Sequence, residues 1–144
     1  MDQTELRNSL TASLSQMYEM EVITNLAEFW QGELRVLHYV HQHNNSKINP
    51  SVLSDALHVS RARITTALSA LRKKGYIVME MSQDDRRRMC VTLTSDGEQY
   101  LKKKQKKVEK YFDILINGLG EVNVRDFIRI IDLSIKVMDS QNSQ

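Results

Sequence analysis

Residues that break helices are scarce in this chain, with one proline and five glycines spread over 144 residues. Proline and glycine are the strongest local punctuation of secondary structure, so most of the sequence meets no obstacle to helix formation. Apolar residues also recur at three- and four-residue steps through much of the chain, as they do in helices that bury one face. The predicted class is therefore mainly α, with one small β-hairpin.

The periodicity predicts several helices separated by short polar turns. A first apolar stripe runs from Leu6 to Phe29, and Gly32 interrupts it. Polar residues 43–47 and the glycine-containing residues 117–120 read as turns between later helices. The expected helical ranges are 2–28, 33–42, 50–58, 60–74, 94–116 and 122–139, with residues 140–144 frayed.

Capping residues predict where the central helices begin and end. Asn49 is placed to cap a helix that starts at Pro50, where the missing N–H of proline costs nothing. Ser60 and Thr94 are the expected N-caps of two later helices, and Gly75 stops the helix between them. The predicted core faces of the two central helices are Val52, Leu53, Ala56 and Leu57, then Ile64, Ala67, Leu68 and Leu71.

Two segments after Gly75 have the pattern of strands. Residues 76–81 and 89–93 are rich in apolar and β-branched side chains, and the polar residues 82–88 lie between them. Two short helices followed by such a hairpin form a winged helix-turn-helix. The second helix of that motif fits the major groove of DNA, and the hairpin reaches phosphates or the adjacent minor groove.

Positive charge is concentrated in the same segment. The chain has a net charge of only +2, yet residues 60–90 carry eight Lys and Arg against three Asp and Glu. Residues 1–59 carry three basic residues against seven acidic ones. A basic element in a neutral-to-acidic body is the pattern expected of a polyanion-binding surface.

Small, hydroxylated and cationic side chains share the outward face of the predicted recognition helix, where they can approach base edges and phosphates. Three arginines at the hairpin tip stabilise no core, and Asp85 is placed to hold one of them while another enters the minor groove. The alternative to a DNA-reading face is an ordinary polar helix face that is exposed to solvent. The candidate DNA-binding residues are Ser60, Arg61, Arg63, Thr65, Thr66, Ser69, Lys73, Arg86, Arg87 and Arg88.

The order and spacing of several motifs resemble the MarR family of transcription regulators over residues 33–97. They are Glu33-Leu34-x-Val36-Leu37, Val52-Leu53-Ser54-Asp55-Ala56-Leu57, Val59-Ser60, Leu71-x-x-x-Gly75, Asp85-Arg86-Arg87 and Val91-x-Leu93-Thr94-x-x-Gly97. Three positions depart from the family's usual pattern: Trp30 at the start of the second helix, Ser82-Gln83 near the wing tip, and Met79 in the first wing strand.

The resemblance implies a homodimer that binds a pseudo-palindromic operator in double-stranded DNA and acts as a repressor. It implies that Arg87 is the minor-groove arginine and that Asp85 orients the wing. The expected organisation is an N-terminal dimerisation helix at 1–29, a DNA-binding domain at 30–94 and C-terminal dimerisation helices at 95–140. A winged-helix module that binds protein and does not read DNA is the rival interpretation.

Regulators of this family usually respond to a small molecule, a metal or an oxidant. Met17, Tyr18, Trp30 and Tyr39 are the candidate residues for an effector pocket, although such side chains are more often core. His38 and His41 are three residues apart and His43 is nearby, but a metal site needs three or four ligands. Cys90, the single cysteine, lies in a wing strand and is interpreted as an inert residue rather than a thiol sensor.

Other classes of protein find no support in the sequence. There is no nucleotide-binding loop and no nucleophile elbow, so neither an enzyme nor a cofactor is expected. No apolar run is long enough to span a membrane, and the N-terminus lacks a secretory signal, so a cytoplasmic protein is expected. The lysine-rich residues 102–107 are interpreted as the solvent face of a long helix, with a contribution to DNA binding as the alternative.

Overall fold

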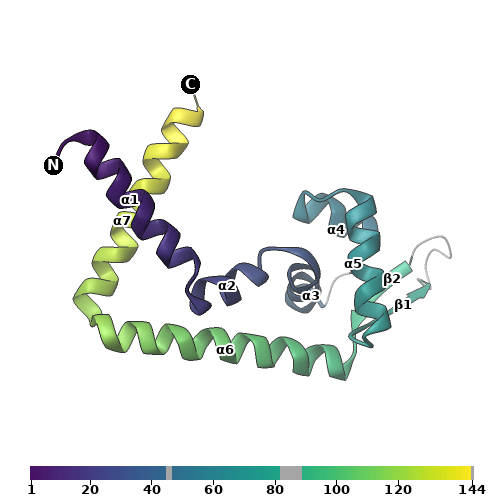
Figure 1. The fold of residues 1–144 in the computed structure, drawn as a ribbon. Coiled ribbons are helices and arrows are strands. Elements are labelled where there is room, and N and C mark those ends of the chain that lie inside the picture. Colours follow the sequence, from purple (N-terminus) through teal and green to yellow (C-terminus); the bar gives the residue numbers. More distant parts are fainter. Residues whose placement is uncertain (45–46, 82–88, 144) are drawn as a thin grey trace. The chain divides into compact units, whose positions relative to one another are not determined.

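The computed structural model describes residues 1–44, 47–81 and 89–143, and it confirms a mainly helical fold with a two-stranded hairpin (Figure 1). The chain divides into two compact units, Met1–Val108 and Glu109–Gln144. The elements are α1 (Gln3–Tyr18), α2 (Glu21–Glu28), α3 (Gly32–Gln42), α4 (Pro50–Leu57), α5 (Arg61–Lys73), β1 (Ile77–Met81), β2 (Met89–Leu93), α6 (Ser95–Leu119) and α7 (Glu121–Asn142).

One hydrophobic core holds the first unit together. Helices α3, α4 and α5, the hairpin and the first turns of α6 each contribute apolar side chains from the face that their periodicity predicts. Burial of these side chains is the main favourable term that fixes α5 against α3 and α4. The buried core residues are Leu34, Val36, Leu37, Val40, Ile48, Leu53, Leu57, Ile64, Leu68, Leu71, Ile77, Val91 and Leu101.

The predicted capping residues are confirmed. The Asn49 side chain accepts a hydrogen bond from the Val52 amide at 2.9 Å, and Pro50 occupies the first turn of α4. The Ser60 hydroxyl accepts a hydrogen bond from the Arg63 amide at 3.2 Å at the start of α5. The predicted burial of Ala56 was wrong: it is exposed, because the buried edge of this two-turn helix follows Leu53 and Leu57.

The strands pair antiparallel, with Ile77 opposite Leu93 and Met81 opposite Met89. The Val91 amide donates a 2.8 Å hydrogen bond to the Ile48 carbonyl, so the segment before α4 also binds to β2. Ile77 and Val91 are buried on the inner face of the hairpin. Residues 82–88, which include Asp85 and the three wing arginines, lie outside the described residues.

A compact joint connects α5, the hairpin and α6. Gly75 ends α5 with a φ of 80°, a backbone conformation that favours glycine. The Thr94 hydroxyl donates a 2.6 Å hydrogen bond to the Gly75 carbonyl and accepts one from the Gly97 amide at 3.0 Å. The Thr94 amide donates to the Tyr76 carbonyl at 3.1 Å. One threonine therefore caps α6 and also ties it to the end of α5.

The single helix predicted at residues 2–28 is in fact two helices. α1 ends at Tyr18, and Met20 adopts an extended backbone before α2 begins at Glu21. α1 buries no residue in this chain, whereas α2 buries Val22. No glycine or proline marks the break, so no local signal predicts it.

The second unit contains the end of α6 and all of α7. The expected turn at residues 117–120 is shorter than predicted, since α6 continues to Leu119 and only Gly120, with a φ of 82°, separates the helices. Residues 140–142 belong to α7 rather than to a frayed end. α7 buries no residue, although nearly half of its residues are apolar.

Candidate nucleic-acid interface

Helix α5 has a buried face and a polar face, as the sequence predicts for a recognition helix. Ile64, Leu68 and Leu71 are each at most 2% exposed and hold the helix against the core. On the remaining surface, which also carries Ala62 and Arg72, the candidate residues with hydroxyl or cationic side chains are all exposed. These are Ser60, Arg61, Arg63, Thr65, Thr66, Ser69 and Lys73, the complete set of candidates predicted on this helix.

The hydroxyl groups on this face differ in what they can offer a ligand. Thr65 donates its hydroxyl proton to the Arg61 carbonyl at 2.8 Å, and Thr66 donates to the Ala62 carbonyl at 3.0 Å. Both therefore present oxygen lone pairs and a methyl group outward. The Ser69 hydroxyl has no hydrogen-bond partner among the described residues, so it is free to donate or accept.

A small cleft lies beside the start of this face. It has a volume of about 490 Å³ and places the Arg61 side chain next to the N-terminus of α4 and to Met89 at the base of the hairpin. The helix N-terminus carries partial positive charge, and the first turn of α4 has no acidic residue. Arg61 forms no ion pair with any described residue, including Asp55 in the same cleft. This geometry suits an anionic oxygen such as that of a phosphate.

A second, larger groove of about 1010 Å³ is formed within the first unit by α1, α2, α3, α5 and the start of α6. Two of the four predicted effector-pocket residues, Tyr18 and Trp30, line it. Met17 and Tyr39 do not. Tyr39 instead packs against the core and stacks on His43, with ring centroids 4.0 Å apart. Arg63 and Thr66 of α5 also line the groove, so it borders the predicted DNA-reading face.

Ion pairs neutralise both acidic residues of this groove. Glu28 accepts a hydrogen bond from Lys104 at 3.2 Å, and Glu33 accepts one from Lys74 at 2.6 Å. The Glu33 carboxylate raises the pKa of Lys74, mainly through that hydrogen bond. Arg35, also on the groove wall, forms no ion pair with a described residue. The unpaired charge in the groove is therefore positive.

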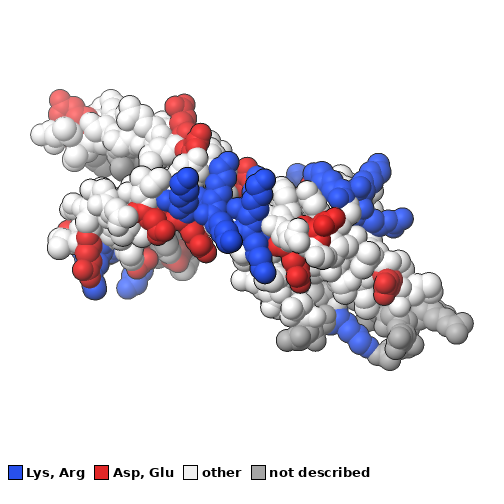
Figure 2. Space-filling view, turned by 90° about the horizontal axis from the view of Figure 1, so that it is seen from below, with Lys and Arg blue, Asp and Glu red and all other residues white. Residues whose placement is uncertain are grey.

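The lysine-rich residues 102–107 are divided between two faces of α6. Lys102, Lys103, Lys106 and Lys107 are exposed, as predicted, whereas the Lys104 side chain is only 27% exposed and turns toward Glu28. Figure 2 shows the molecule of Figure 1 from below, where α6 lies. Lys and Arg side chains form a band on this side.

The histidines do not form a metal centre in the described part of the chain. No three His, Cys, Asp or Glu residues come together there in a way that could hold a metal ion. His38 packs edge-on against Phe29, with ring centroids 5.6 Å apart, and its Nδ1 atom has no hydrogen-bond partner among the described residues. Burial lowers the pKa of His38, and the neighbouring His41 lowers it further. Cys90 is half-buried in β2, opposite Glu80.

Comparison with known proteins gives related findings. A family model described as a winged helix DNA-binding domain matches residues 33–112. A putative transcriptional regulatory protein for the hcr operon of Thauera aromatica is 40% identical over 58 residues, which are 40% of this chain and 35% of the relative. The match thus spans about a third of that relative's length.

Solved structures share the fold at low sequence identity. A variant of the Staphylococcus aureus transcription regulator MepR has a TM-score of 0.72 at 16% identity, over 96% of this chain and 99% of that one. A second MepR variant, bound to an oligodeoxyribonucleotide, has a TM-score of 0.65 at 17% identity, over 92% and 97%. The heme sensor PefR from Streptococcus agalactiae, in complex with heme, has a TM-score of 0.63 at 18% identity, over 96% and 95%.

The fold and the polar face of α5 are those of a DNA-binding protein of the winged helix-turn-helix class. The family model matches more than half of the sequence, and the chain belongs to the winged helix DNA-binding domain family. The predicted resemblance to MarR regulators is confirmed in the fold. No helix in the described ranges is both long and apolar enough to cross a membrane.

Several residues of the candidate sites were not found by sequence reasoning. Arg35 lies on a helix whose polar positions carry no distinguishing pattern, and only the packing of α2, α3 and α5 brings it to the groove. Glu33 and Lys74 are 41 residues apart, so no local spacing connects them. Glu28 and Lys104 are 76 residues apart and were missed for the same reason.

Proposed function

We propose that this protein is a sequence-specific transcription regulator that represses by occluding a promoter, and that it binds a pseudo-palindromic operator as a homodimer. The observation that carries the proposal is the face of α5, where every predicted reading residue is exposed while Ile64, Leu68 and Leu71 fix the helix from behind. A rigid helix that presents hydroxyl and cationic groups fits the major groove.

Residues 30–94 make the DNA contacts in this proposal. The two α5 helices of the dimer enter successive major grooves about one helical turn apart. Arg61 and the start of α4 hold a phosphate, and Arg86, Arg87 and Arg88 reach the flanking minor grooves, with Asp85 orienting the wing. The MepR variant bound to an oligodeoxyribonucleotide supports duplex DNA as the partner. A protein that acts on promoter DNA in this way works in the cytoplasm.

Dimerisation uses residues 1–29 and 95–140. α1 exposes Leu6, Leu10 and Leu14 at four-residue steps, each at least 50% accessible. α7 exposes apolar residues around most of its circumference, and a helix with that pattern is stable only when another surface covers it. Large apolar residues exposed on α7 are Val122, Phe127, Ile128, Ile130, Ile131, Leu133, Ile135, Val137 and Met138.

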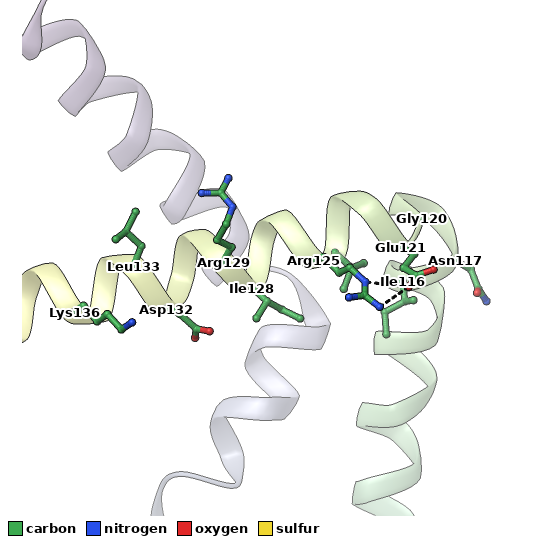
Figure 3. Close-up of a pocket in the computed structure, with 11 residues that line it drawn as sticks. Ile116, Asn117, Gly120, Glu121, Arg125, Ile128, Arg129, Asp132, Leu133 and Lys136 are labelled. Carbon is green, nitrogen blue, oxygen red and sulfur yellow. Dashed lines mark hydrogen bonds and ion pairs between the residues drawn. The ribbon is translucent and has the colours of Figure 1, made fainter.

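A hollow of about 1230 Å³ at the start of α7 supports the same interface (Figure 3). The close-up shows Arg125 paired with Glu121, at 2.8 Å, with Ile128 and Asp132 farther along the helix. A concave surface with an apolar floor and a polar rim is the usual anatomy of a protein interface. A second copy of this chain is the occupant that the exposed apolar residues of α7 require.

The groove beside α5 is the proposed effector site. Tyr18 and Trp30 offer aromatic surface, and Arg35 and Arg63 supply positive charge that no described acid neutralises. The chemistry fits a small planar anion, such as an aromatic carboxylate, that stacks on the rings and binds a guanidinium group. Since Arg63 and Thr66 belong to both the groove and the DNA-reading face, a ligand there opposes DNA binding.

The test is binding of the purified full-length protein to its own upstream promoter fragment and to scrambled DNA over a series of salt concentrations. We expect tighter binding to the promoter and a steep fall of affinity with salt. Arg87→Ala is expected to reduce the slope of log affinity against log salt by about 0.9. Equal and weak binding to both DNA fragments would contradict the proposal.

A further inference from the structure

Four lysines on the outer surface of α6 fall within the range proposed for dimerisation, but they make none of the DNA or effector contacts proposed above. We call Lys102, Lys103, Lys106 and Lys107 the lysine face. With about 3.6 residues per helical turn, these four side chains lie within an arc of about 140°. Leu101, which is buried, and Val108, which is half-buried, lie on the opposite side of the helix. The lysine face is therefore directed away from the core that anchors α6.

The lysine face holds like charges close together without compensation. None of its four ammonium groups forms an ion pair with a described residue. Lysines four residues apart on a helix repel one another, and two such pairs occur here. Lys103 and Lys107 have no acidic residue three or four positions away, whereas Glu98 and Glu109 lie only at the Lys102 and Lys106 edge. Such an arrangement weakly destabilises the helix, and a bound polyanion would offset the repulsion.

The chemistry of the lysine face discriminates among polyanions. Protein interfaces are enriched in aromatic residues and arginine and depleted in lysine, and this face has neither an aromatic residue nor arginine. A membrane-surface helix needs an apolar face to insert, but the apolar face of α6 in this unit is directed into the core. Lysine is a mobile point charge that suits phosphate groups without reading bases.

We propose that the lysine face binds the phosphate backbone of duplex DNA, independently of base sequence, as a second contact in addition to that of α5. This inference rests on one part of the proposed function, namely that the protein binds DNA. The contact adds affinity for DNA beyond the operator and makes that affinity depend more steeply on salt. It is absent when the duplex covers only the footprint of the recognition helices and wings.

The experiment compares the full-length protein with a variant in which Lys102, Lys103, Lys106 and Lys107 are all changed to Gln. Fluorescence anisotropy measures the affinity for a minimal operator duplex and for an operator duplex twice as long, over a salt series. On the long duplex the variant should lose about 0.9 of slope for each phosphate contact removed. On the minimal duplex the slopes of the two proteins should agree.

Lys104→Gln is the matched control, because it removes one charge from the same run but from the side chain that pairs with Glu28. Its slope on the long duplex should equal that of the wild type. Circular dichroism checks folding, and Lys103→Gln/Lys107→Gln replaces the fourfold variant if that one fails to fold.

The outcomes separate this inference from the proposed function. Equal slopes for wild type and lysine variant on the long duplex overturn the inference, whether or not the operator is read. A second outcome is that the wild type binds with a steep salt dependence that the variant loses, while neither protein prefers the operator. That outcome supports the lysine face and contradicts sequence-specific reading. Loss of slope on the long duplex together with retained operator preference supports both.

Discussion

Gly97 lies so close to Tyr76 that a side chain at this position has no room. A Cβ atom on Gly97 would come within 3.2 Å of the Tyr76 Cα and closer still to its carbonyl group. The neighbours are backbone atoms that the Thr94 amide already holds through the Tyr76 carbonyl. The close approach of α6 to the start of the hairpin therefore requires glycine.

Gly97→Ala should lower the free energy of unfolding by about 1–3 kcal/mol, since the backbone must shift to admit the methyl group. Urea unfolding followed by circular dichroism measures the change. Gly118→Ala is the control, because Gly118 lies within α6 with no atom near its missing Cβ. That variant should gain about 0.5–1 kcal/mol from helix propensity. Equal changes in the free energy of unfolding at the two sites would show that the contact with Tyr76 does not affect stability.

Changing both Thr66 and Ser69 to Ala should remove most of the preference for the operator over scrambled DNA. Removal of one hydrogen bond to a base edge is expected to cost about 0.5–1.5 kcal/mol in discrimination. Affinity for scrambled DNA should hardly change, because no positive charge is removed. Competition binding measures the ratio, with Ser140→Ala at the end of α7 as the control. A retained preference would mean that α5 does not read the bases.

Ile131→Glu should convert the dimer to a monomer, because it places a charge within the apolar surface of α7. Light scattering coupled to size-exclusion chromatography gives the mass directly. Val78→Glu is the control, since Val78 is an exposed apolar residue on β1, which takes no part in the proposed interface. Dimers of equal stability in both variants would exclude α7 from the interface.

Benzoate should bind the groove and quench the single tryptophan, since Trp30 lines it. Arg35→Gln should weaken benzoate binding by about tenfold or more, as expected for loss of a charge-assisted hydrogen bond. Arg129→Gln, on α7, controls for general loss of charge. A cationic aromatic amine should bind more weakly than benzoate. The reverse order of affinity would contradict the proposed anionic ligand.

Acidification should destabilise the protein through His38. Burial lowers the pKa of this imidazole below its ordinary value of 6.5, so the unfolded chain takes up the proton more readily than the folded one. The contribution of neutral His38 to the free energy of unfolding is complete above about pH 6.5. It is lost as the pH falls toward the lowered pKa of the folded state. His38→Gln should therefore lose less stability than wild type between about pH 7 and pH 5.

Local patterns predicted the part of the fold that local chemistry determines. The caps Asn49 and Ser60 and the buried stripe through Ile64 and Leu68 all follow from residues within one or two turns of each other. The polar face of α5 was predicted for the same reason. The break at Met20 was not predicted, because no glycine or proline marks it in the sequence.

The groove and the charge pairs depend on contacts that sequence spacing does not encode. Lys103 and Lys104 are adjacent in the sequence, yet only the position of Glu28 on α2 makes one free and the other paired. Ile48 follows a polar run and was not assigned to the core, but its backbone binds Val91 and its side chain is buried. Such residues are found only when the tertiary structure is known.

The hydrogen bonds that Thr65 and Thr66 donate to their own helix limit the operators that α5 is able to read. Their oxygens accept hydrogen bonds, and in the major groove only adenine and cytosine carry exocyclic amines that donate. Guanine presents acceptors there and has to be read by a donor, such as Arg61, Arg63 or Lys73. One proton of an adenine amine pairs with thymine, so a methyl group on that nitrogen would replace the other proton, which a threonine oxygen would otherwise accept. Regulation by this protein would then be sensitive to covalent marks on the DNA as well as to its sequence.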